Sequence, residues 1–179
     1  LIVEKAKKDG FVAYTDFPDI NKVYKRDVLR IFSQRLMKKE RTDISSYYNF
    51  WEIDSKYADD NYYILAHTQG LLLTDNFEFL AEFNPVKGLN FVSEIAGLSK
   101  QNIKKGIIEN GDILNFQKEP TNEYDRNAVK VYKDDFFLGY IKKVHNKVFY
   151  KKNGEKLKLE VKGIDHNGKI NRIFIKIFL

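Results

Sequence analysis

The chain has 179 residues, of which 43% are hydrophobic and 15% aromatic, enough to fill one sizeable core or two small ones. It contains no cysteine, which excludes disulfide frameworks, thiolate zinc sites and cysteine nucleophiles and favours a cytoplasmic location. No apolar run approaches the roughly 18 to 20 residues that span a bilayer, and the first ten residues are too charged for the core of a signal peptide.

The net charge of +6 is unevenly distributed. Residues 1–85 hold 12 Lys and Arg against 14 Asp and Glu, whereas residues 86–179 hold 19 against 11. Because a linker-like Asn-Pro-Val-Lys-Gly stretch lies at this boundary, we expect two domains, 1–85 and 86–179. A basic module beside a near-neutral one favours a polyanionic partner, most often nucleic acid. The alternative is a lysine-rich surface that only maintains solubility.

The first half of the chain is predicted to be mostly helical. Apolar residues at helical spacing predict an amphipathic helix over about residues 22–38. Asp43 is placed to cap a second helix, whose aromatic face lies within residues 44–51. Asp59 or Asp60 is placed to cap a third, which ends near a Gln-Gly pair. These aromatic faces are expected to form core packing rather than a ligand platform.

The second half alternates with the two-residue period of β-strands. Strands are predicted at residues 91–98, 112–117, 128–132, 136–141, 157–162 and 172–179, and one more at 76–83 in the first half. Two short helices are expected between them, one capped by Ser99 and one over about 143–152. Closing such short strands into a small barrel removes their exposed edges. We therefore predict an α+β protein, with a helical N-terminal module followed by a β-barrel with two short helices.

Searches for catalytic motifs find nothing. The sequence lacks a phosphate-binding glycine loop, a Gly-x-Ser-x-Gly nucleophile turn and a dinucleotide-binding fingerprint. The three histidines, His67, His145 and His166, lie far apart without metal-ligand spacing. We therefore predict a protein that is not an enzyme, with no cofactor and no metal site.

One polar segment carries a specific pattern. The run from Glu119 to Val129 reads Glu-Pro-Thr-Asn-Glu-Tyr-Asp-Arg-Asn-Ala-Val, a Leu-Gly-Tyr follows at 138–140, and Ala-Gly-Leu at 96–98 with Gly-Asp at 111–112 precede it. Together these motifs resemble the HIRAN domain, over residues of about 88–179. The resemblance implies an OB-like barrel that binds single-stranded DNA. In the fork-remodelling eukaryotic members of this family the domain captures a free 3′ end.

The resemblance also implies roles for individual residues. Tyr124 would stack on a base, Asp125 would accept the terminal hydroxyl, and Asn122 would line the pocket. Tyr140 and Lys143 fall where the family places phosphate-contacting groups. A tyrosine beside an aspartate in a polar loop offers a ring face and a hydroxyl acceptor on chemical grounds as well. The alternative is that the Asn and Asp side chains only cap the turn through bonds to the backbone.

Two lysine features complete the predicted interface. Ser99-Lys100 stands where end-binding members carry an Arg-aromatic pair, which leaves Lys100 as a cation without the fork geometry of arginine. Lys143, Lys147 and Lys151 recur every fourth residue, so on a helix they would form one row able to follow a phosphate backbone. A solvated helix face without a partner is the alternative reading of that row.

The N-terminal half resembles known segments more weakly. Its Phe-x-x-x-Leu at the end of a helix, followed by a Leu-Ala-x-x-x-Gly, is similar to the segment that accompanies many bacterial HIRAN proteins and to the N-terminal subdomain of HipA-type toxin kinases. An unrelated three-helix packing unit is the alternative.

The leading prediction is a DNA-binding protein that prefers single strands or ends. The rival prediction is a regulatory or antitoxin-type partner of a separately encoded HipA-like kinase, with Phe32, Leu36 or Trp51 in the docking surface.

Overall fold

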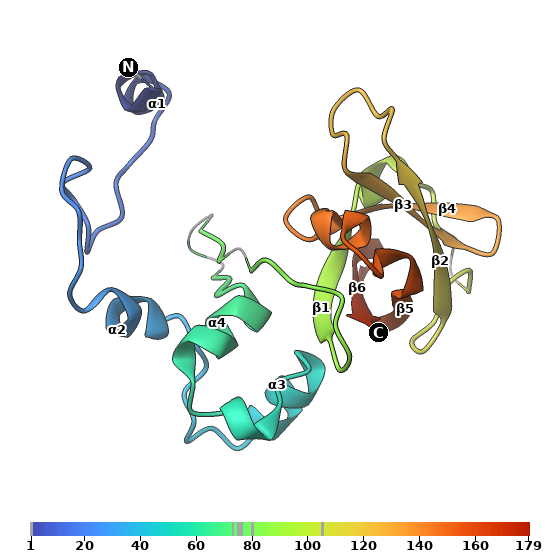
Figure 1. Cartoon of the computed structure of the whole chain (residues 1–179), viewed down its shortest axis with the longest axis horizontal. Coiled ribbons are helices and arrows are strands. Elements are labelled where there is room, and N and C mark those ends of the chain that lie inside the picture. Colours follow the sequence, from blue (N-terminus) through green and yellow to red (C-terminus); the bar gives the residue numbers. More distant parts are fainter. Residues whose placement is uncertain (1, 73, 75–76, 80, 105) are drawn as a thin grey trace.

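The computed structural model describes residues 2–72, 74, 77–79, 81–104 and 106–179 (Figure 1). Within these ranges the α-helices are α1 (Ile2–Lys8), α2 (Val28–Ser33), α3 (Ile44–Phe50) and α4 (Asn61–Thr68). The strands are β1 (Asn90–Ala96), β2 (Ile113–Glu119), β3 (Ala128–Lys133), β4 (Phe136–Ile141), β5 (Lys158–Asn167) and β6 (Lys169–Phe178). Short 3₁₀ helices are η1 (Ser55–Tyr57), η2 (Leu98–Lys100), η3 (Asn146–Tyr150) and η4 (Gly154–Lys156). None of the described helices is long and apolar enough to cross a membrane.

The strands close into a barrel in the order β1-β4-β3-β2-β5-β6, with antiparallel pairing throughout. The two-residue period explains this packing, because alternate side chains of a strand point to opposite faces of a sheet. In β6, Ile173, Ile175 and Ile177 are fully buried, and they alternate with partly exposed residues. The fully buried Phe149 of η3 belongs to the same core. The predicted α+β architecture with a six-stranded barrel is confirmed.

The N-terminal helices are shorter than the sequence predicts. The helix expected over 22–38 contains only α2, which begins after Asp27, a residue in the left-handed region. Asp43 precedes α3 but does not cap it, because both carboxylate oxygens accept hydrogen bonds from Arg41. Asp60 caps α4 as predicted, since its Oδ1 accepts from the backbone N–H groups of Tyr62 and Tyr63. Asp60 therefore satisfies N–H groups at the start of α4, whereas the Asp43 carboxylate binds a cation instead.

Both helices predicted in the second half are wrong. Ser99 lies inside η2 instead of capping a helix, and residues 101–104 and 106–112 form none. Residues 143–152 contain only η3, a 3₁₀ helix. Of the three lysines, only Lys147 lies within η3, whereas Lys143 precedes it and Lys151 follows it, so they do not form the expected row on one helix. Within η3, Asn146 and Tyr150 instead donate hydrogen bonds to residues more than 20 positions away, the Asp125 carboxylate and the Ala128 carbonyl.

The strand predicted at 76–83 is not present in its described part. Residues 76 and 80 lie outside the described residues, and residues 77–79 and 81–83 are irregular. Phe83 is instead stacked on Phe91 of β1, with ring centroids 4.0 Å apart. Phe83 therefore packs onto the barrel, whereas Phe77 and Phe79 contact Tyr14 and Phe32 of the N-terminal half.

Helix α3 packs against the outside of the barrel. Phe50 and Trp51 make edge contacts with the Phe174 ring of β6, and Trp51 is only 9% exposed. Glu52 forms ion pairs with Lys162 and Lys176. Trp51 is therefore not part of an exposed docking surface, which corrects that prediction, while Phe32 and Leu36 are partly buried. The division into domains at residue 85 stays a prediction.

Gly139 is expected to be essential for closing the barrel between β1 and β4. A Cβ at this position would lie 2.3 Å from the Ala96 carbonyl oxygen and 2.9 Å from Cγ2 of Ile95, and φ is +150°. Because the backbone cannot move aside as a side chain can, Gly139→Ala should lower the free energy of unfolding by about 3 kcal/mol. Gly168→Ala is the matched control, since φ is +74° with no atom within 4 Å, and should cost only about 1 kcal/mol. If urea denaturation shows that the two variants lose equal amounts of the free energy of unfolding, this explanation is wrong.

Candidate nucleic-acid interface

The loop of residues 120–127 joins β2 to β3 at the top of the barrel in Figure 1. Asn122 fixes its backbone, because its Oδ1 accepts hydrogen bonds from the N–H groups of Tyr124 and Asp125, both at 3.0 Å. The amide of Asn122 donates in turn to Oε2 of Glu119, at 2.7 Å. This is the Asx-type capping that the sequence offered as an alternative role for Asn122. The bonds hold the loop in one conformation and do not use the Tyr124 side chain.

Tyr124 stands out from this loop. Its side chain is 90% exposed, the most exposed of the large hydrophobic residues described. Burial of an aromatic ring is a large source of stability in most proteins, so a ring left in water on a fixed backbone is unusual. The geometry leaves both faces of the phenol ring accessible to a planar partner.

Asp125 anchors the loop to η3. Its Oδ1 accepts from the Asn127 N–H at 2.9 Å, and its Oδ2 accepts from the side-chain amide of Asn146 at 2.6 Å. Asn146 is itself buried in η3. A carboxylate has about four acceptor sites, so Asp125 keeps capacity for one further donor. The structure therefore gives Asp125 a capping role and leaves a second role chemically open.

Glu119 connects the loop to the outer face of the barrel. Its carboxylate accepts from Lys130 at 2.6 Å, from Asn122 at 2.7 Å and from the Tyr140 hydroxyl at 3.2 Å. The hydrogen bond from Lys130 is the main cause that holds the pKa of Glu119 below its ordinary value. Desolvation first, and the bond to Glu119 second, raise the pKa of Tyr140, so its hydroxyl stays protonated and donates. Asn122 and Tyr140 are thus brought together through one shared, charge-compensated carboxylate.

An aromatic strip extends from Tyr140 along the outside of the barrel. The Phe137 ring lies 5.4 Å from that of Tyr140 and 5.6 Å from that of Tyr132, and all three side chains are partly exposed. The sequence reasoning missed Tyr132 and Phe137. A usable signal was present, because Val129 and Val131 alternate with Lys130 and Tyr132, which puts Tyr132 on the same face as a lysine.

The predicted lysines surround this region at different positions. Lys100 is exposed in η2, and Gly97, which precedes η2, lies near the Tyr140 ring. Lys143 and Lys147 are exposed before and within η3. Lys151 is partly buried, and its ammonium donates to the Phe83 carbonyl at 2.8 Å and to Oδ1 of Asn84 at 2.9 Å. The single helical row is therefore wrong, because only Lys147 of its three lysines lies within η3.

The histidines have structural positions. His67 and His145 are 7% and 3% exposed, and burial lowers the pKa of each to about 4. Nδ1 of His145 lies 2.8 Å from the Ser93 hydroxyl, and both rings pack around Phe83. Among the described residues, no group of three His, Cys, Asp or Glu side chains is arranged to hold a metal ion. His67 and His145 therefore occupy core positions.

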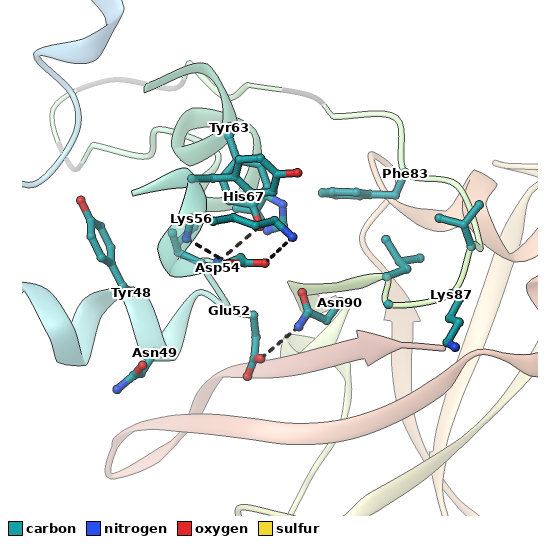
Figure 2. Close-up of a pocket in the computed structure, with 15 residues that line it drawn as sticks. Tyr48, Asn49, Glu52, Asp54, Lys56, Tyr63, His67, Phe83, Lys87 and Asn90 are labelled. Atoms are coloured by element: carbon teal, nitrogen blue, oxygen red, sulfur yellow. Dashed lines mark hydrogen bonds and ion pairs between the residues drawn. The ribbon is translucent and has the colours of Figure 1, made fainter. Parts of the chain in front are cut away.

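A cavity of about 480 Å³ lies between α3, α4 and the segment that leads into β1 (Figure 2). Figure 2 shows Asp54 paired with Lys56, at 2.8 Å, and Glu52 directed to the Asn90 amide. Glu52 also pairs with Lys162 outside the lining. These carboxylates are thus compensated within the protein, and none of the predicted site residues lines the cavity.

The comparisons with known proteins concern the second half of the chain. A family model described as "HIRAN domain" matches residues 88–178, a range that contains all six strands and every predicted interface residue. The search of curated proteins gave no match. Among solved structures, the crystal structure of the HIRAN domain of human HLTF matches with 20% identity and a TM-score of 0.36, covering 49% of this chain and 74% of that one. The resemblance of the first half to HipA-type subdomains stays a prediction.

Proposed function

Since the chain belongs to the HIRAN domain family, we propose that its barrel binds DNA, with a preference for single strands or strand ends. The observation that carries the proposal is Tyr124, a ring 90% exposed on a loop whose backbone Asn122 holds in place. Proteins that bind single strands present aromatic rings on which bases stack, beside basic groups that meet the phosphates. The proposed activity is binding without catalysis.

The outer face of the barrel supplies the rest of the proposed site. Tyr140 and the neighbouring aromatic strip offer further apolar surface for bases or sugars. Lys100, Lys143 and Lys147 are the proposed phosphate contacts, and each is exposed. The ion pair with Lys130 compensates the charge of Glu119, so this carboxylate repels a phosphate less than a free one would.

Asp125 is the proposed contact for a 3′ hydroxyl. Its carboxylate accepts two hydrogen bonds in the structure and can accept one more from a terminal hydroxyl, but it would repel a terminal phosphate. Wild type should therefore bind an oligonucleotide with a 3′ hydroxyl more tightly than the same one with a 3′ phosphate. Asp125→Asn keeps an acceptor for the Asn127 N–H and should reduce this preference. If wild type does not distinguish the two ends, the barrel binds strands without capturing ends.

Salt provides an independent test of the phosphate contacts. If the three proposed lysines and one further cation meet phosphates, the affinity for a single strand should fall with a log–log slope of about −2.8, since each contact contributes about −0.7. The affinity should then be about fiftyfold weaker at about 200 mM salt than at about 50 mM. Anisotropy titrations over a salt series measure the slope. A slope near zero would contradict a phosphate-dependent mode of binding.

A further inference from the structure

A cleft of about 340 Å³ separates η3 from the segment that precedes the barrel. One wall is formed by Ala81, Glu82 and Phe83, and the other by Lys143, Val144, His145, Lys147, Val148 and Lys151. The first wall lies outside residues 88–178, the range that matches the family model. The volume is within the range of about 300 to 1,000 Å³ typical of ligand sites.

Specific contacts hold the first wall in position. Lys151 binds the Phe83 carbonyl and the side chain of Asn84, at 2.8 and 2.9 Å. On its other side the Phe83 ring stacks on the Phe91 ring of β1, with an angle of 14° between the planes. The cleft is therefore bounded by groups fixed to the barrel, and a ligand would find it already formed.

The charges of the cleft favour an anion. Lys143 and Lys147 are exposed at its edge, and the two oxygens that Lys151 contacts belong to neutral groups, so they do not cancel its charge. Glu82 is the single carboxylate in the lining. Phe83, Val144 and Val148 add apolar surface. A cleft that combines lysines with apolar side chains can bind a nucleic-acid strand, because the phosphates contact the lysines while a sugar or base packs on the apolar surface.

Helix η3 both contacts the Tyr124 loop and lines the cleft. The Asn146 amide donates to Asp125 of that loop at 2.6 Å, and the next residue, Lys147, lines the cleft. We propose that a single strand held at Tyr124 continues along η3 into this cleft, so that residues 81–83 form part of the binding site. This inference rests on the proposed function, and it gives the N-terminal part of the chain a role in affinity for longer strands.

The test uses the full chain with oligothymidylates of about four and about twelve nucleotides, the range of site sizes of OB-type barrels. Ala81→Glu places a carboxylate in the cleft and should weaken binding of the longer strand about tenfold, while the shorter strand binds within about twofold of wild type. Glu82→Gln removes the carboxylate from an exposed position and should tighten binding of the longer strand about threefold. Ala58→Glu and Glu109→Gln are the matched controls outside the cleft.

The possible outcomes separate the two proposals. If the cleft variants leave both strands unaffected while Tyr124→Ala weakens both, the cleft proposal is overturned and the proposed function stands. The cleft proposal is also overturned if Ala81→Glu weakens binding of the short and the long strand equally. It is overturned as well if Ala58→Glu, outside the cleft, weakens binding of the longer strand as much as Ala81→Glu does. If wild type binds neither oligonucleotide, the proposed function itself fails. Glu82→Gln changes only a surface side chain, so misfolding does not obscure the result.

Discussion

Replacement of Tyr124 by alanine is expected to weaken single-strand binding about ten- to a hundredfold. Stacking of one base on an aromatic ring is worth about 1–3 kcal/mol by alanine substitution. The ring is 90% exposed, so its loss should change the free energy of unfolding by less than about 0.5 kcal/mol. Anisotropy titration with a labelled oligothymidylate and urea denaturation of the same samples measure the two quantities.

Two further variants make the Tyr124 experiment specific. Tyr124→Phe keeps the ring and should retain most of the affinity, since stacking does not need the hydroxyl. Phe11→Ala removes an aromatic ring that is 44% exposed in the segment after α1, outside the lining of the cleft and the loop, and should leave binding unchanged. If Tyr124→Ala folds normally and binds as wild type does, the loop is not the interface.

The barrel could be predicted because its strands carry their burial pattern in the sequence. The alternation of isoleucines in β6 with Phe174 and Lys176 fixes which face turns inward, and the bounds of β4 agree with the prediction to the residue. The helices were less predictable, because side chains expected to cap or align them interact with other groups in the folded chain. Asp43 binds Arg41 instead of the helix, and η3 follows contacts to residues more than 20 positions away.

The candidate site was predictable in composition but not in its connections. The loop with Asn122, Tyr124 and Asp125 stands out in the sequence as a polar run between two strands. Its link to η3 joins Asp125 to Asn146, 21 residues later, which no local pattern indicates. The contact of Lys151 with Phe83 spans 68 residues, so the same holds for the cleft wall. Such pairings depend on the closed barrel, which brings these segments together only after folding.

Acid is expected to destabilise the protein through its two buried histidines. His67 and His145 both pack against Phe83, with ring centroids 5.5 and 5.7 Å from it. Burial disfavours the imidazolium and lowers the pKa of both from 6.5 to about 4, and for His145 the nearby charge of Lys142 acts in the same direction. The unfolded chain therefore takes up protons between pH 6.5 and about 4 that the folded chain does not.

The sign and size of this effect follow from linkage. Stability is fully present above pH 6.5 and is lost as the pH falls towards 4, at about 1.4 kcal/mol per pH unit for each histidine. At about pH 5 the two histidines together should cost about 4 kcal/mol relative to pH 7, measured by urea denaturation. His67→Leu should remove about half of this pH dependence. A wild-type free energy of unfolding that is equal at the two pH values would show that both histidines can be protonated within the fold, and therefore that the packing around Phe83 opens to water.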